Sequence, residues 1–176
     1  MQAAAPSVLT VEDDPIVRAD LRLVLEDAGF DVVADARDGV EAVELARVHR
    51  PDLILLDLGL PRLDGIEASQ RILAERRVPI VALTGRSPQL AEQAIAAGAS
   101  SCVQKPFSST ELVDAVTEAL AAHDERELLA LREASLRSIE TVVELVGYPR
   151  EYAAGLEQTS WERGHIWRLS EGRALG

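Results

Sequence analysis

The hydrophobic pattern of residues 7–122 repeats five times as a short apolar run followed by a longer segment with apolar positions at helical spacing. Runs as short as Leu53–Leu56 are too brief for a helix, and their fully apolar character is typical of parallel strands buried on both faces. Capping signals bound the helical segments: Asp14 precedes a proline, and Gly29 ends the first of them. The expected strands are 7–12, 31–35, 53–57, 79–84 and 100–104, and the expected helices are 14–28, 39–50, 64–75, 88–97 and one from 108 onward.

Five consecutive strand–helix units predict an α/β fold, with a mostly parallel sheet, helices on both faces and right-handed crossovers. The strand 31–35 is short and flanked by aspartates, so we expect it near an edge. In the helix 39–50, Val40, Val43 and Leu45–Ala46 are expected to form the buried side. No glycine-rich phosphate loop follows the first strand, which disfavours dinucleotide-binding and P-loop functions.

Composition narrows the class of protein further. The chain has 176 residues, is 47% hydrophobic and carries a net charge of −12, so we expect a globular protein that does not bind nucleic acid or anionic membranes non-specifically. It contains no apolar run long enough to span a membrane. Residues 1–6 lack the features of a secretory signal and are expected to be disordered. The single cysteine, Cys102, fits a reducing cytoplasm.

Lysine usage singles out one position. Of the 18 basic residues, only Lys105 is a lysine. An ammonium group is a compact point charge that a planar guanidinium does not reproduce. We therefore expect Lys105 to have a specific role.

Polar residues follow the apolar runs at the carboxyl ends of the expected strands. Glu12 and Asp13 follow the first strand, Asp57 ends the third, Thr84 the fourth, and Lys105 the fifth. These ends lie on one edge of a parallel sheet, which is where ligands bind in open α/β folds. Three carboxylates repel one another unless a hard divalent cation such as Mg²⁺ neutralises them. A carboxylate nucleophile with Mg²⁺, a lysine and a hydroxyl indicates phosphoryl transfer.

Four motifs in order, Val11–Pro15, Leu56–Pro61 with Asp64-Gly65, Leu83–Gly85 and Lys105–Phe107, resemble the signature set of response-regulator receiver domains. The resemblance covers residues 7–122 and implies a flavodoxin-like, doubly wound (βα)5 fold with strand order 2-1-3-4-5. It also implies that Asp57 accepts a phosphoryl group from a sensor histidine kinase. By the same resemblance, Mg²⁺ is held by Glu12, Asp13, Asp57 and the backbone carbonyl of Gly59, and the phosphoryl oxygens are contacted by Thr84 and Lys105.

Three positions of this chain concern how it would switch and how long it would keep a phosphoryl group. Receiver domains usually carry Tyr or Phe three residues before the lysine, where this chain has Cys102, so the usual aromatic switch is missing. Gly59 and Arg86 occupy the two positions that commonly tune loss of the phosphoryl group. Cys102 is expected to be a small buried apolar residue rather than a redox sensor.

Residues 123–146 continue the last helix with heptad spacing of apolar residues, interrupted at Arg132. Two interpretations stay open: a coiled coil that forms a homodimer, or an amphipathic helix folded back onto the receiver. The heptad positions are Leu129, Leu136, Ile139, Val143 and Val146.

After this helix the periodicity is lost, and residues 147–176 are expected to be an irregular or diverged tail. The receiver followed by a leucine-rich helix is similar to ANTAR-type antiterminator regulators, in which a small helical RNA-binding module comes next. Its Ala-Lys-Gly motif is absent, because no lysine follows Lys105. RNA is thus a partner by resemblance alone, and no helix-turn-helix DNA-binding domain is visible. Four alternatives would explain the missing motif: loss of the module, truncation, divergence or a shifted reading frame. We favour the shifted reading frame.

The favoured function is a phosphorylation-dependent switch, not a turnover enzyme, that alters dimerisation or partner binding. A haloacid-dehalogenase-like phosphatase would share the aspartyl nucleophile and Mg²⁺. It would also need a second carboxylate two residues after Asp57, where this chain has Gly59. A third possibility, an unphosphorylated receiver-like binding module, is disfavoured by the intact acidic set and Lys105.

Overall fold

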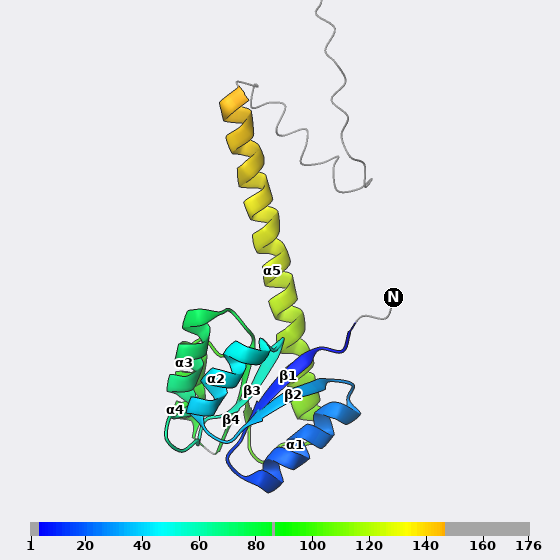
Figure 1. Ribbon diagram of the computed structural model, residues 1–176, viewed down its shortest axis with the longest axis vertical. Coiled ribbons are helices and arrows are strands. Elements are labelled where there is room, and N and C mark those ends of the chain that lie inside the picture. Colours follow the sequence, from blue (N-terminus) through cyan, green and yellow to red (C-terminus); the bar gives the residue numbers. More distant parts are fainter. Residues whose placement is uncertain (1–3, 86, 147–176) are drawn as a thin grey trace, which may run out of the picture. The chain divides into compact units, whose positions relative to one another are not determined.

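The computed structural model describes residues 4–85 and 87–146, with side chains described as far as residue 138. Five parallel strands form one sheet in the order β2-β1-β3-β4-β5, as predicted, with a helix following each strand (Figure 1). β2 is an edge strand, as expected. The elements are β1 (Ser7–Val11), α1 (Pro15–Asp27), β2 (Asp31–Ala36), α2 (Gly39–His49), β3 (Leu53–Asp57), α3 (Gly65–Glu75), β4 (Ile80–Thr84), α4 (Pro88–Ala96), β5 (Ser101–Gln104) and α5 (Ser109–Val146).

The sheet separates two layers of helices. Leu21 and Leu25 of α1 and Leu112 of α5 pack with one face of the sheet, whereas α2 and α3 pack on the other (Figure 1). Every residue of β3 and β4 is buried, which matches strands covered on both sides. The apolar runs in the sequence therefore correspond to the centre of the sheet.

Helix α2 corrects one expectation. Val40, predicted to face inward, is 42% exposed, and the buried residues of α2 are Gly39, Ala42 and Ala46. These small residues let the helix lie close to its neighbours. A Cβ on Gly39 would lie 2.2 Å from the backbone oxygen of Leu63, so this contact requires glycine.

Side-chain caps fix the loops that lead into the helices. Asp14 accepts hydrogen bonds from the amides at the start of α1, and Asp38 does the same for α2 while pairing with Arg62 at 2.7 Å. Ser108 and Glu111 form the reciprocal capping box predicted for the last helix. These caps belong to loops at the carboxyl edge of the sheet, where the candidate site lies.

The helix expected over residues 123–146 forms part of α5. The chain divides into two units, Met1–Arg126 and Glu127–Gly176. In the second unit Leu129 and Leu131 are 50% and 62% exposed. No described helix has the length and apolar character needed to cross a membrane. The expectations for residues 1–3, Arg86 and the tail 147–176 fall outside the described residues.

Candidate functional site

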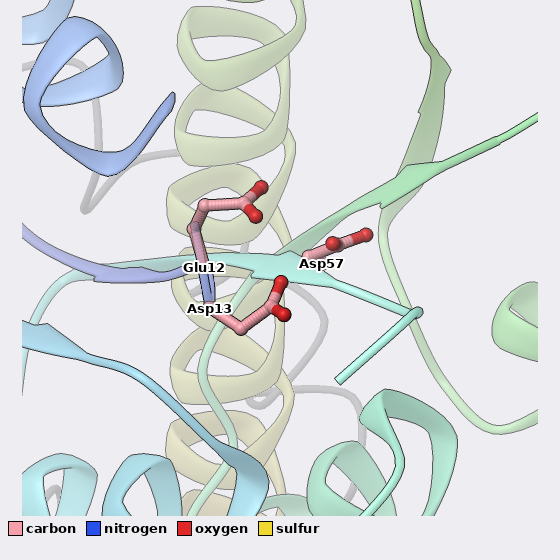
Figure 2. Close-up of side chains that lie close together, drawn as sticks. All are labelled: Glu12, Asp13 and Asp57. Atoms are coloured by element: carbon pink, nitrogen blue, oxygen red, sulfur yellow. The ribbon is translucent and has the colours of Figure 1, made fainter. Parts of the chain in front are cut away.

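Three carboxylates meet at the carboxyl edge of the sheet. Glu12 and Asp13 follow β1, and Asp57 is the last residue of the neighbouring strand β3. One oxygen from each carboxylate lies within 4.8 Å of the others (Figure 2). Glu12 and Asp57 are buried, whereas Asp13 is exposed. The fold thus brings together the three acidic residues that the sequence singled out.

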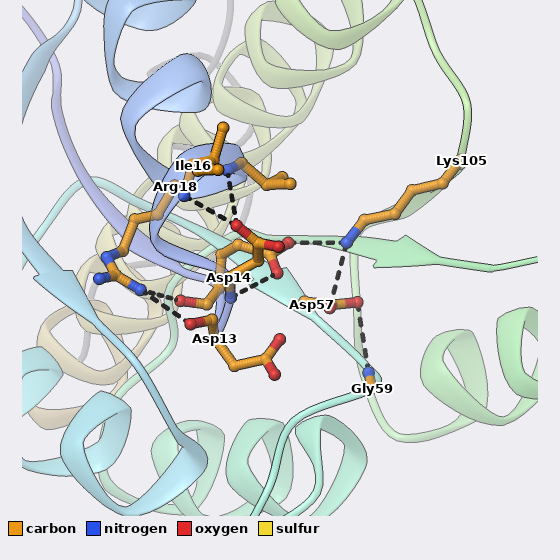
Figure 3. A network of polar contacts seen from close by, with 9 residues as sticks. Asp13, Asp14, Ile16, Arg18, Asp57, Gly59 and Lys105 are labelled. Carbon is orange, nitrogen blue, oxygen red and sulfur yellow. Dashed lines mark hydrogen bonds and ion pairs between the residues drawn. The ribbon is translucent and has the colours of Figure 1, made fainter.

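Lys105 enters this cluster from the end of β5. Its Nζ lies 2.7 Å from Oε2 of Glu12 and 3.1 Å from Oδ2 of Asp57 (Figure 3). Its backbone amide donates a hydrogen bond to the carbonyl of Thr84 at the end of β4. The only lysine of the chain therefore bridges two of the three carboxylates.

The burial of these groups affects their protonation. Burial raises the pKa of Glu12 and the nearby charge of Asp57 adds to this effect, while the hydrogen bond from Lys105 opposes it. Burial alone would lower the pKa of Lys105, but hydrogen bonds to Glu12 and Asp57 raise it above its usual value. The negative charge of the cluster therefore holds the lysine in its protonated form.

Backbone groups and one arginine hold the acidic loops in place. The amide of Asp14 donates to Oε1 of Glu12, and the amide of Gly59 donates to Oδ1 of Asp57, each at 3.2 Å. Arg18 of α1 donates from one guanidinium nitrogen to the carbonyls of Glu12 at 2.6 Å and Asp13 at 3.3 Å (Figure 3). Sequence analysis missed Arg18. The one feature of the sequence that pointed to Arg18 was its position, five residues after the acidic pair in the first turn of α1.

The remaining predicted residues lie around this cluster. Thr84 is buried, and its Oγ1 has no hydrogen-bond partner among the described residues. A Cβ on Gly59 would lie 3.7 Å from Oδ2 of Asp57, in ordinary van der Waals contact, so this position directly adjoins the carboxylate. Cys102 is only partly buried, against the cluster that contains Ala82, although a buried residue was expected there; burial raises the pKa of its thiol. Arg86 is not among the described residues.

This donor set suits a hard divalent cation. Its ligand atoms are carboxylate oxygens, which Mg²⁺ prefers, and the exposure of Asp13 leaves the site open to water. The unpartnered hydroxyl of Thr84 and the ammonium of Lys105 are donors that suit the oxygens of a phosphoryl group.

Comparison with known proteins identifies the family. Residues 8–117 match the model of the response regulator receiver domain. The chain belongs to the response-regulator receiver family. This confirms the resemblance drawn from the four motifs. Receiver structures also share the fold: one is the signal receiver domain of a modulated diguanylate cyclase from Desulfovibrio desulfuricans G20. It has a TM-score of 0.64 and 31% identity, over 69% of this chain and 98% of that one.

Two curated relatives with different printed names match this chain over different shares of their own length. The transcriptional regulatory protein PdtaR of Mycobacterium tuberculosis (strain CDC 1551 / Oshkosh) is 45% identical over 131 residues, which are 73% of this chain and 63% of PdtaR. A protein-glutamate methylesterase/protein-glutamine glutaminase 4 of Myxococcus xanthus (strain DK1622) is 45% identical over 57% of this chain and 30% of that protein. The receiver-family chain thus spans less than two thirds of the length of either relative.

Proposed function

We propose that this receiver domain accepts a phosphoryl group on Asp57 in a Mg²⁺-dependent reaction, with a sensor histidine kinase or a small acyl phosphate as donor. The observation that carries the proposal is the position of Asp57 beside both the other carboxylates and Lys105. Phosphoryl transfer needs in-line positioning and neutralisation of charge on the transferred oxygens. The cluster offers both to a donor approaching from the open edge of the sheet.

In the proposed reaction a carboxylate oxygen of Asp57 bonds to the donor's phosphorus, and the bond from phosphorus to the donor's nitrogen or oxygen breaks. The electron pair of the broken bond leaves with the donor. The amide of Gly59 orients the Asp57 carboxylate. Lys105 holds a positive charge beside the transferred group, and Thr84 supplies a hydroxyl donor.

Mg²⁺ fits the donor atoms present, because they are all oxygens. We assign Glu12, Asp13, Asp57 and the backbone carbonyl of Gly59 to hold it. The bound ion supplies positive charge that neutralises the transferring phosphoryl oxygens. Arg18 fixes the backbone that carries the first two of these carboxylates.

The output is proposed to be regulation of transcription by a phosphorylation-dependent change in self-association or partner binding. The 45% identity with the transcriptional regulatory protein PdtaR supports this assignment. The heptad positions of residues 123–146 support a homodimer. RNA remains a candidate partner through the resemblance to ANTAR-type regulators alone, and a kinase partner implies that the domain works in the cytoplasm.

The competing phosphatase hypothesis depends on a second carboxylate two residues after the nucleophile. Gly59 occupies that position and offers only backbone groups to Asp57. This observation favours a stored aspartyl phosphate over turnover of phosphate esters.

The test is intact-mass measurement after incubation with acetyl phosphate, with and without MgCl₂. We expect one phosphoryl adduct with Mg²⁺, none in Asp57→Asn, and a normal adduct in the matched control Asp31→Asn, an exposed aspartate at the opposite edge of the sheet. Size-exclusion chromatography of the same samples measures the oligomeric state. An adduct that persists in folded Asp57→Asn would refute the assignment of the acceptor.

A further inference from the structure

A second feature of the receiver unit lies at the sheet edge opposite the carboxylates. A pocket of about 110 Å³ opens between the C-terminal ends of α2 and α3 and the first residues of β3. Its floor is apolar: Ile54, Ile72 and Val78 are buried and line it, together with other residues of the same character. None of the residues assigned to phosphoryl transfer lines this pocket, so it is a separate site.

The pocket rim is positively charged. Arg47, Arg50 and Arg76 line it with one acidic residue, Glu75. Arg47 and Arg50 form no ion pair or side-chain hydrogen bond with the described residues, and Arg76 has only an electrostatic interaction with Asp52. The chain has a net charge of −12, yet within its described part no carboxylate forms a close ion pair with these guanidinium groups.

Part of this charge has a structural explanation. Arg47 lies in the last turn of α2, where a cation is favoured by the helix dipole. Arg50 caps the same helix with φ of 48°, a left-handed conformation that glycine or asparagine adopts more readily. The dipole does not account for the apolar hollow that these arginines and Arg76 surround.

We propose that this pocket binds a small organic anion. A compact apolar group would lie on the floor formed by Ile54, Ile72 and Val78, and a carboxylate or similar anionic group would lie between the arginines of α2 and Arg76. Guanidinium groups recognise such oxyanions through paired N–H donors. An enclosed apolar cavity of about 150 Å³ accommodates benzene. The pocket between α2 and α3 has a volume of about 110 Å³ but is open to solvent, so it suits a ligand with one ring or a short branched chain.

The apolar floor distinguishes this ligand from a polyanion. A nucleic-acid backbone would use the arginines but has no apolar group to bury on Ile54 and Ile72. The net charge of −12 would also repel a long polyanion from the rest of the surface. We therefore assign the pocket to a single small anion.

The test uses benzoate as the probe and neutral benzamide as its isosteric control. Titration of methyl-labelled protein, followed by NMR, should show saturable shifts at the methyl groups of Ile54, Ile72 and Val78 with benzoate. For a ligand of this size the Kd should be on the order of 1 mM. Benzamide should bind at least about tenfold more weakly, because it lacks the charge that the arginines recognise.

Substitutions of the arginines test whether the pocket rim binds the benzoate carboxylate. The double substitution Arg47→Gln and Arg76→Gln should weaken benzoate binding at least about tenfold, on the basis of two lost charge-assisted contacts. Arg71→Gln is the matched control, because Arg71 lies on α3, pairs with Glu67 and does not line the pocket. Unchanged affinity in the double variant, or shifts spread over other surfaces, would overturn the proposal.

The site is independent of phosphoryl transfer, so its test is repeated in Asp57→Asn. We expect unchanged benzoate binding there, and a loss would contradict the separation of the two sites. A short RNA and anionic phospholipid vesicles serve as further probes. If either binds through Arg47 and Arg76 while benzoate does not, the small-anion assignment is wrong.

Discussion

Replacing Lys105 by methionine tests the charge balance of the carboxylate cluster most directly. At an effective dielectric constant of about 20, an ion pair at 2.7 Å or 3.1 Å has a gross Coulomb energy of about 5–6 kcal/mol. Removing one partner of a buried pair costs about 3–5 kcal/mol. The Lys105 side chain is 28% exposed, so water compensates part of the loss, whereas the Glu12 side chain, at 3%, remains buried. We expect Lys105→Met to lower the free energy of unfolding by about 2–3 kcal/mol.

The assay is urea denaturation at pH 7 in EDTA, so that no divalent cation replaces the ammonium. A double-mutant cycle with Glu12→Gln isolates the pair, because Gln leaves no unpaired charge. We expect a coupling energy on the order of 1–2 kcal/mol, with the double variant less destabilised than the sum of the single variants. Additivity within about 0.5 kcal/mol would refute the view that Lys105 neutralises Glu12.

Three further predictions concern residues around the site. Gly39→Ala should destabilise the domain by at least about 2 kcal/mol in thermal unfolding, because its Cβ would meet the Leu63 carbonyl. Gly85→Ala should be nearly neutral, because no atom of the described residues other than its chain neighbours lies within 4 Å of the new Cβ. Arg18→Gln should slow Mg²⁺-dependent phosphorylation by acetyl phosphate several-fold while the domain stays folded; an unchanged rate would contradict its positioning role. Amides at the start of α2 keep the pKa of Asp38 below its usual value. Asp38→Asn keeps a capping oxygen but loses the charge, so it should lower the free energy of unfolding by about 0.3–1 kcal/mol at pH 7. This cost should disappear as pH falls through that lowered pKa; a cost independent of pH would contradict the linkage.

The sequence by itself determined the order of elements and the identity of the acidic site. Apolar runs such as Leu53–Leu56 indicate buried parallel strands, because they are too short for a helix and a strand covered on both faces is apolar throughout. Polar residues placed at the ends of such runs must share one edge of the sheet. This rule alone predicts that Glu12, Asp13, Asp57 and Lys105 lie at one site.

Tertiary structure decided what depends on packing between distant segments. Val40 is apolar but exposed, because α2 packs through Gly39 and Ala42 instead, and periodicity does not reveal which of two adjacent faces fits closely. The contacts of Arg18 depend on the path of a loop that residue patterns do not specify.

The arginine-lined pocket is the clearest case of this division. Arg47 and Arg76 are 29 positions apart in the sequence and look like ordinary surface charges there. Only the packing of α2 beside α3 places them around one apolar floor. The sequence fixes which side chains can bury or carry charge, but the space between two packed helices exists only once both are in place, so pockets and their ligands belong to the folded chain.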